Sequence, residues 1–136
     1  MNHAFLDTSV VVQFLVGEPG DLTNRAINLL ENLADRDEIL HISTTVIFET
    51  VYVLNGTYGV PRSLVADRLG RFIRLPGVVL PEVDEVIGAF DLWEAQSPLS
   101  FADCYHLVLA KSLGLSRIYS FDKKMNRYSG VERVEP

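Results

Sequence analysis

The sequence of 136 residues contains one cysteine, Cys104, which excludes an intrachain disulfide and is typical of a protein from a reducing compartment. No uninterrupted run reaches the roughly 18 apolar residues that a transmembrane helix needs. The N-terminus has no basic segment, and Asp7 interrupts the first apolar run, so we expect no secretory signal peptide. These absences predict a cytoplasmic protein with no membrane association.

Basic residues are scarce in the first part of the chain. Residues 1–60 hold eight acids but only two bases, Arg25 and Arg36, whereas residues 61–136 hold ten of each, and the net charge is −6. An acidic balance argues against general nucleic-acid binding. Residues 111–133 differ, because six bases face two acids there. This local excess permits a phosphate-binding face, although a solvated surface explains it equally well.

The apolar pattern alternates between strand-like and helix-like segments. Strands are expected at 3–6 (buried), 39–43, 78–80, 117–120 and 131–134; helices are expected from residue 8 or 9, at 21–36, 44–58, 61–74, from 83 to near Ser97, and at 100–113. This order predicts one α/β domain over residues 1–136, with a mainly parallel sheet covered by helices on both faces. Sites in such sheets form at the carboxyl ends of the strands.

Four carboxylates stand where the pattern does not require an acid. Asp7 and Asp122 each follow a strand, so both are expected at the carboxyl edge of the sheet. Glu49 is the only charged residue of an apolar helical segment, which makes it either a desolvated acid or part of a polar site. Asp103 sits in the first turn of another apolar helix.

Each acid also has a simpler structural explanation. Ser100 and Asp103 have the spacing of a capping box, while Asp7 and Asp122 could cap the helical segments that follow them. Glu49 could lie at a helix edge that reaches water. A divalent cation accounts for the whole set, since clustered carboxylates repel each other unless a cation compensates, and Mg²⁺ prefers such oxygen ligands. Metal-activated water would then hydrolyse a phosphodiester.

The segments "FLDTS", "STTVIFETVYVL", "LSFADCYHLVLAKSLG" and "IYSFDKKM…GVERV" together resemble a PIN domain, specifically the VapC-type toxin ribonucleases. The resemblance covers almost the whole chain. It implies a three-layer α/β/α sandwich with a central, mainly parallel sheet, and an Mg²⁺- or Mn²⁺-dependent endoribonuclease. It also implies a homodimer that a small VapB-like antitoxin neutralises.

The resemblance also assigns roles to individual residues. It places the metal-binding and catalytic acids at Asp7, Glu49, Asp103 and Asp122, with Thr8, Ser9 and Ser120 in support. Three positions depart from the family pattern: Cys104, Lys111 and Met125. None of them removes an acid, but Lys111 interrupts a face of small residues and puts the shape of the cleft there in doubt.

Other residues carry weaker signals. His3, His41 and His106 lack metal-site spacing, and Tyr52, Tyr58 and Tyr105 are expected in the core rather than as base-stacking platforms. Arg68, Arg71 and Arg74 form a basic stripe that is either solvated or a contact for RNA or an antitoxin. Two other functions stay open: a non-catalytic PIN-like module that binds RNA or protein, and another Mg²⁺-dependent phosphate hydrolase. The second is disfavoured, because aspartyl phosphatases carry another aspartate two positions after the first, where this chain has Ser9.

Overall fold

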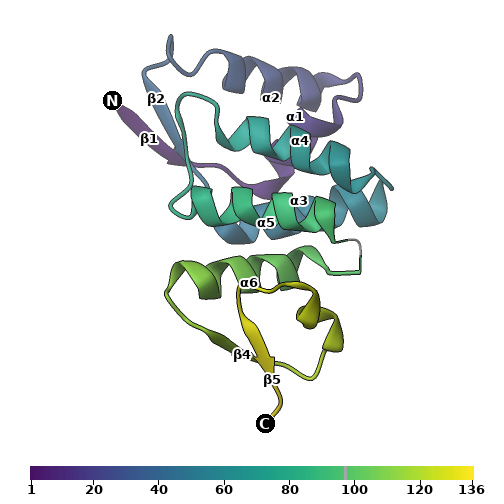
Figure 1. The fold of residues 1–136 in the computed structure, drawn as a ribbon. Coiled ribbons are helices and arrows are strands. Elements are labelled where there is room, and N and C mark those ends of the chain that lie inside the picture. Colours follow the sequence, from purple (N-terminus) through teal and green to yellow (C-terminus); the bar gives the residue numbers. More distant parts are fainter. Residues whose placement is uncertain (97) are drawn as a thin grey trace. The chain divides into compact units, whose positions relative to one another are not determined.

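The computed structural model describes residues 1–96 and 98–136, which fall into two units, Met1–Pro81 and Glu82–Pro136. In the first unit, the strands β1 (Asn2–Phe5), β2 (Glu38–His41) and β3 (Val78–Val79) pair in parallel in the order β1-β2-β3. Figure 1 shows β1 and β2 side by side. The expected parallel pairing is therefore confirmed for this unit.

Helices account for most of the first unit: α1 (Thr8–Val16), α2 (Asp21–Glu31), α3 (Thr44–Val51), the π-helix η1 (Tyr52–Thr57) and α4 (Arg62–Ile73). Several helix termini lie at residues that suit them. Ser43 caps α3 by accepting a bond from the Val46 amide at 3.3 Å, and Pro61 precedes α4. Gly59, with φ of 67°, takes the left-handed conformation that ends the segment before α4. The core of the unit consists of fully buried aliphatic residues such as Val11, Ile47, Leu54 and Leu69.

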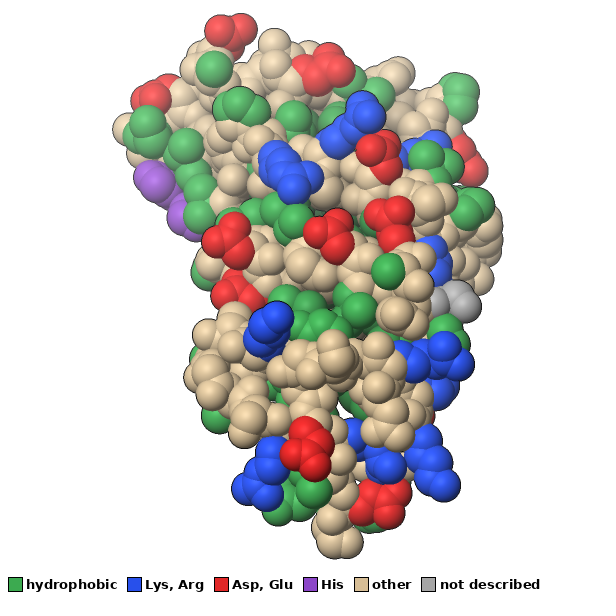
Figure 2. Space-filling model, viewed as in Figure 1, with side chains coloured by type: hydrophobic (Ala, Val, Ile, Leu, Met, Phe, Trp, Pro, Cys, Tyr) green, Lys and Arg blue, Asp and Glu red, His purple; other side chains and the backbone are tan. Residues whose placement is uncertain are grey.

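The second unit is a helical pair with a small sheet: α5 (Val83–Ala95), α6 (Phe101–Ser112), β4 (Arg117–Tyr119), the 3₁₀-helix η2 (Lys123–Arg127) and β5 (Glu132–Val134). The strands β4 and β5 are parallel. Phe101 packs edge-on against Phe90 and Trp93, with ring centroids 4.8 and 5.7 Å apart. Figure 2 shows Lys and Arg side chains gathered over the segments from β4 to β5, where the sequence has its local basic excess.

Four expectations about the elements were wrong. The first strand is not buried, because all four residues of β1 are exposed at the sheet edge and burial begins only at Leu6. The helix expected at 21–36 ends at Glu31 and continues as turns to Asp37, whose φ of 51° no helix allows. The helix expected at 44–58 changes to π-helical geometry at Tyr52. Tyr52 and Tyr58 are exposed rather than core residues, at 74% and 47%.

The remaining element expectations are confirmed within a residue or two, and the helix expected to end near Ser97 ends at Ala95. Cys104 is fully buried, as expected for a small core residue. Among the described residues, no helix combines the length and apolar character needed to span a membrane.

Candidate functional site

Asp7 follows β1 and is the N-cap of α1. Its Oδ2 accepts two hydrogen bonds from Ser9, one from the hydroxyl at 2.8 Å and one from the backbone amide at 3.2 Å. These bonds, with a smaller contribution from the Thr8 amide, hold the pKa of the Asp7 carboxyl below its ordinary value. Asp7 is therefore an exposed, ionised carboxylate at neutral pH.

The next residue, Thr8, has an unsatisfied hydroxyl. Its Oγ1 is buried and has no hydrogen-bond partner among residues 1–96 and 98–136. Buried polar atoms are rarely left unpaired, because the lost hydration costs about 1–3 kcal/mol. A bound water or ligand oxygen at the start of α1 would satisfy this hydroxyl, which makes the vicinity of Asp7 a candidate ligand position.

Glu49 lies on α3, and its exposure distinguishes a desolvated acid from an acid at a helix edge that reaches water. The side chain is exposed to solvent, although its neighbours Ile47 and Thr50 are fully buried. The interpretation of Glu49 as a desolvated acid was therefore wrong. Glu49 lies at an edge of α3 that reaches water. An exposed carboxylate can ligate a hydrated cation without the cost of burying a charge.

Asp103 forms the capping box that its spacing predicted. The Asp103 amide donates to Ser100 Oγ, and the Ser100 amide donates to Asp103 Oδ2, both at 3.1 Å. The half-buried Asp103 side chain therefore stabilises the start of α6. This role uses Oδ2 and is compatible with metal ligation by the same carboxylate.

Asp122 also caps a helical segment. Its Oδ1 accepts from the Lys124 amide at 3.0 Å at the start of η2, and Lys124 Nζ lies 3.7 Å from Oδ2. The Asp122 amide donates to Ser120 Oγ at 3.0 Å, so the hydroxyl at the end of β4 fixes the backbone that carries the acid. Arg133 from β5 donates to the Ser120 carbonyl oxygen at 2.9 Å. This network holds the backbone that presents Asp122, and the supporting role expected for Ser120 stays a prediction.

The four acids are divided between the two units. Asp7 and Glu49 belong to the first unit, and Asp103 and Asp122 belong to the second. Within the part of the chain that the structure describes, no group of three or more His, Cys, Asp or Glu side chains is arranged to hold a metal ion. The joint four-acid site therefore stays a prediction. The donor chemistry nevertheless fits a hard divalent cation, since each residue offers carboxylate oxygens and none is fully buried.

Other expected residues take ordinary structural roles. His3 and His41 pair across β1 and β2, with Nδ1 and Nε2 2.8 Å apart, and His106 is exposed on α6. In the arginine stripe of α4, each side chain is engaged locally: Arg68 donates to the Leu15 carbonyl oxygen, Arg71 pairs with Asp67, and Arg74 donates to the Gly70 carbonyl oxygen. Lys111 is exposed, with Nζ 6.0 Å from the centre of the Tyr128 ring.

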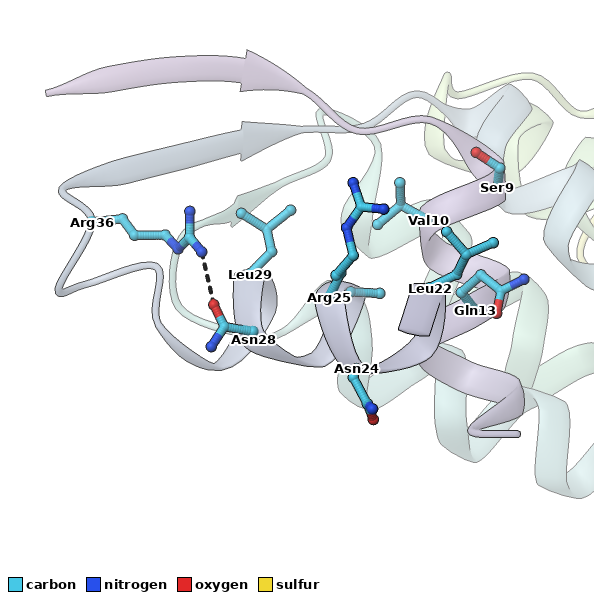
Figure 3. A pocket seen from close by; sticks show the side chains of 10 residues that line it. Ser9, Val10, Gln13, Leu22, Asn24, Arg25, Asn28, Leu29 and Arg36 are labelled. Carbon is cyan, nitrogen blue, oxygen red and sulfur yellow. Dashed lines mark hydrogen bonds between the residues drawn. The ribbon is translucent and has the colours of Figure 1, made fainter. Parts of the chain in front are cut away.

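The structure adds a pocket that the sequence did not predict. A cavity of about 690 Å³ lies between α1 and α2 in the first unit (Figure 3). Its lining comprises Ser9, Val10, Gln13, Leu22, Asn24, Arg25, Ala26, Asn28, Leu29 and Arg36. Because Ser9 is bonded to Asp7, the pocket begins next to that carboxylate. Arg25 and Arg36 are the two bases of residues 1–60, but no sequence pattern indicated that they share a cavity.

Comparison with known proteins places this arrangement in a family. The family model of the PIN domain matches residues 4–131, and the chain belongs to the PIN domain family. The expected PIN-like α/β/α sandwich class is thereby confirmed. The match extends over both units and contains all four acids.

Individual relatives carry more particular names. The chain is 28% identical over 134 residues to a VapC ribonuclease of Aquifex aeolicus (strain VF5), covering 96% of this chain and 95% of that protein. Among solved structures, it is similar to the Mycobacterium tuberculosis toxin VapC20, described as cleaving the sarcin-ricin loop. That likeness has 24% identity and a TM-score of 0.38, over 97% of this chain and 98% of the other.

Proposed function

We propose that this protein is a metal-dependent endoribonuclease of the VapC type, the toxin component of a toxin–antitoxin pair. The observation that carries the proposal is the PIN-family match over residues 4–131, a range that contains all four acids that the resemblance assigns to the metal site. The similarity to a VapC ribonuclease over nearly the full length of both chains supports the same activity.

In this proposal the two units belong to one PIN-like domain, residues 1–136, and the four acids act together. Asp7, Glu49, Asp103 and Asp122 hold Mg²⁺ or Mn²⁺ and orient the RNA phosphodiester. When bound, the cation supplies Lewis-acid activation of water and stabilisation of the leaving oxygen. Ser9 lowers the pKa of Asp7, and Ser120 fixes the backbone at Asp122. Thr8 offers its unsatisfied hydroxyl to a water or substrate oxygen.

The proposed partners are a single-stranded or loop RNA substrate, a second copy of the chain and a small VapB-like antitoxin. The apolar faces of α4 and α5 are the candidate contacts for the two protein partners, since short chains have limited means to cover every such face. An antitoxin could then deliver an arginine to the acidic residues. We expect the protein to act in the cytoplasm, where RNA is available and Cys104 stays reduced.

The decisive experiment is an RNA cleavage assay with purified protein. We expect cleavage of single-stranded RNA in Mg²⁺ or Mn²⁺ that leaves 5′-phosphates, and no cleavage in excess EDTA. The Asp7→Asn variant, which keeps the cap but removes a charge, serves as the inactive control. Cleavage that continues undiminished in EDTA would contradict the proposal.

One observation favours a second candidate, a non-catalytic PIN-like binding module. Each of the three aspartates caps a helical segment, so each has a structural reason to be present without any metal. Glu49 distinguishes the two candidate functions, because its exposed side chain has no capping role that would explain an acid there without a metal. A protein that binds RNA equally well with and without Mg²⁺, and never cleaves it, would favour the module.

A further inference from the structure

The pocket between α1 and α2 has an unusual charge for its position. Residues 1–60 hold eight acids and two bases, yet both bases, Arg25 and Arg36, line the pocket and no acid does. If the lining residues were drawn at random from residues 1–60, acids would outnumber bases among them. The pocket is therefore a cationic site within an acidic region, and its chemistry favours an anionic ligand.

The two arginines are held at the pocket in different ways. Arg36 Nη2 donates to Asn28 Oδ1 at 2.8 Å, which fixes its guanidinium beside α2 (Figure 3). Arg25 Nη1 lies 3.5 Å from Asp21 Oδ2, but both side chains are largely exposed, at 71% and 82%. An exposed pair of this kind contributes little, so Arg25 can exchange its partner for a phosphate at small cost.

The rest of the lining suits a nucleotide rather than a free phosphate. Figure 3 shows Leu22, Arg25 and Leu29 projecting from the same side of α2, so apolar surface lies beside the cation. Amide side chains of Gln13 and Asn28 also belong to the lining, whereas Figure 3 shows the Asn24 side chain pointing to the opposite side of α2. Apolar and guanidinium surfaces stack on unpaired bases, and amides bond to base edges. The volume of about 690 Å³ falls within the roughly 300–1,000 Å³ of small-ligand sites.

A hydrogen bond joins the two helices that form the pocket. The Thr23 hydroxyl, on a residue that is only 4% exposed, donates to Gln13 Oε1 at 3.0 Å and joins α2 to α1. At the other end, Ser9 lines the pocket and is bonded to Asp7. A ligand in the pocket would thus lie directly beside a proposed metal-binding acid.

We propose that the α1–α2 pocket binds an unpaired nucleotide of the RNA substrate flanking the scissile phosphate, with Arg25 and Arg36 contacting its phosphates. This inference rests on the proposed ribonuclease function. It assigns substrate positioning to the two bases of residues 1–60. It also explains how a protein of net charge −6 can attract RNA beside its acidic site.

The test is a binding titration, in which fluorescence anisotropy follows a short fluorescein-labelled single-stranded RNA of mixed sequence. Divalent metal is omitted and EDTA is present, so that cleavage does not interfere. We expect Arg25→Gln and Arg36→Gln each to weaken binding by about tenfold, the lower end for a hydrogen bond to a charged group. The slope of log affinity against log salt should fall by about 0.7 for each phosphate that the variant no longer neutralises.

Arg71→Gln is the matched control. Arg71 pairs with Asp67 at the same i,i+4 spacing, 3.2 Å apart, and is 80% exposed, but it lies on α4 and does not line the pocket. We expect its RNA affinity to equal that of the wild type. An equal reduction of affinity in Arg71→Gln would mean that only general charge matters and would overturn the inference, as would unchanged binding in both pocket variants.

A second pair of variants tests the pocket without removing an arginine. Leu22 is 59% exposed in the first turn of α2, and Leu64 is 38% exposed in the first turn of α4. An acid is compatible with a helix N-terminus, so Leu22→Asp and Leu64→Asp should both fold. We expect only Leu22→Asp, which puts a carboxylate on the pocket wall, to weaken RNA binding.

The outcomes separate this inference from the function on which it rests. Wild-type protein that cleaves RNA in Mg²⁺, with pocket variants that bind and cleave equally well, would overturn the inference alone. Wild-type protein that neither binds nor cleaves RNA would overturn the proposed function as well. Pocket variants that keep RNA affinity but no longer associate with an antitoxin would assign the pocket to a protein partner, against this proposal.

Discussion

Ser9 donates both its hydroxyl and its backbone amide to the same oxygen of Asp7, at 2.8 and 3.2 Å. Ser9 also lines the α1–α2 pocket, so one side chain touches both the carboxylate and the cavity. Its hydroxyl bond is the largest cause of the lowered pKa of Asp7. Ser9 is therefore the residue through which the state of this acid can be altered without replacing it.

We predict that Ser9→Ala raises the pKa of Asp7 towards its ordinary value, because the variant lacks the hydroxyl bond that lowers the pKa most, while the amide bond remains. A carboxyl-carbon NMR titration of the metal-free protein measures the change directly. Since the folded-state pKa of Asp7 is lowered, its contribution to stability is present above the unfolded-state pKa and disappears as pH falls through the folded-state value. The difference in stability between Ser9→Ala and wild type should accordingly shrink on acidification. A pKa that does not move would show that Ser9 has no such role.

Asp122→Asn tests whether this residue is more than a cap. Asparagine caps about as well as aspartate, and the exposed ion pair with Lys124 contributes little, so we expect stability within about 0.5 kcal/mol of wild type. Cleavage should nevertheless be abolished if Asp122 is a metal ligand as proposed, because the substitution removes its negative charge. Asp84→Asn, a substitution in the first turn of α5, should keep full activity. Full activity of Asp122→Asn would leave capping as its only role.

At the start of α6, the N-cap residue Ser100 and the proposed metal ligand Asp103 are different residues, so the two roles can be tested separately. Ser100→Ala removes the N-cap hydroxyl and should cost about 1 kcal/mol in the free energy of unfolding. Metal affinity should stay close to that of the wild type. Asp103→Asn should show the reverse, with a small decrease in stability and a large decrease in metal affinity. Denaturant melts and calorimetric Mg²⁺ titration measure the two quantities, and equal effects of both variants on metal affinity would contradict the assignment.

Mg²⁺ should raise the melting temperature of the wild type, because a ligand stabilises the state that binds it. At about 100 times Kd the gain is about 2.7 kcal/mol, which is roughly 10 °C for a protein of this size. Glu49→Gln should shift less at the same concentration, while Glu94→Gln, an exposed residue of α5, should match the wild type. Identical shifts in all three proteins would remove Glu49 from the metal site.

Light scattering at increasing concentration tests the proposed homodimer. We expect a mass of twice 15.2 kDa and a stable complex with the product of an adjacent antitoxin gene. A monodisperse monomer at high concentration, indifferent to that product, would contradict both expectations.

The sequence predicted the elements well where local chemistry determines them. Ser100 and Asp103 have the spacing of a capping box and form one, and Asp7 and Asp122 follow their strands as expected. Glu49 was harder, because a single charge among apolar residues does not reveal which side of the helix meets water. The exposure of β1 depends on its edge position, which the apolar pattern alone does not give. The pocket required the packing of α1 on α2, which no pattern encodes.

The π-helix that follows Glu49 bears on how relatives of this protein should be aligned. In η1 the Tyr58 amide donates to the Val53 carbonyl oxygen at 3.0 Å, the i→i+5 spacing that holds one more residue than an α-helical turn. Such a turn is what a one-residue insertion into an α-helix produces. Relatives that lack the insertion should therefore show a gap of about one residue between Glu49 and Pro61. An alignment that places the gap before Glu49 would pair Glu49 with the wrong residue of the relative.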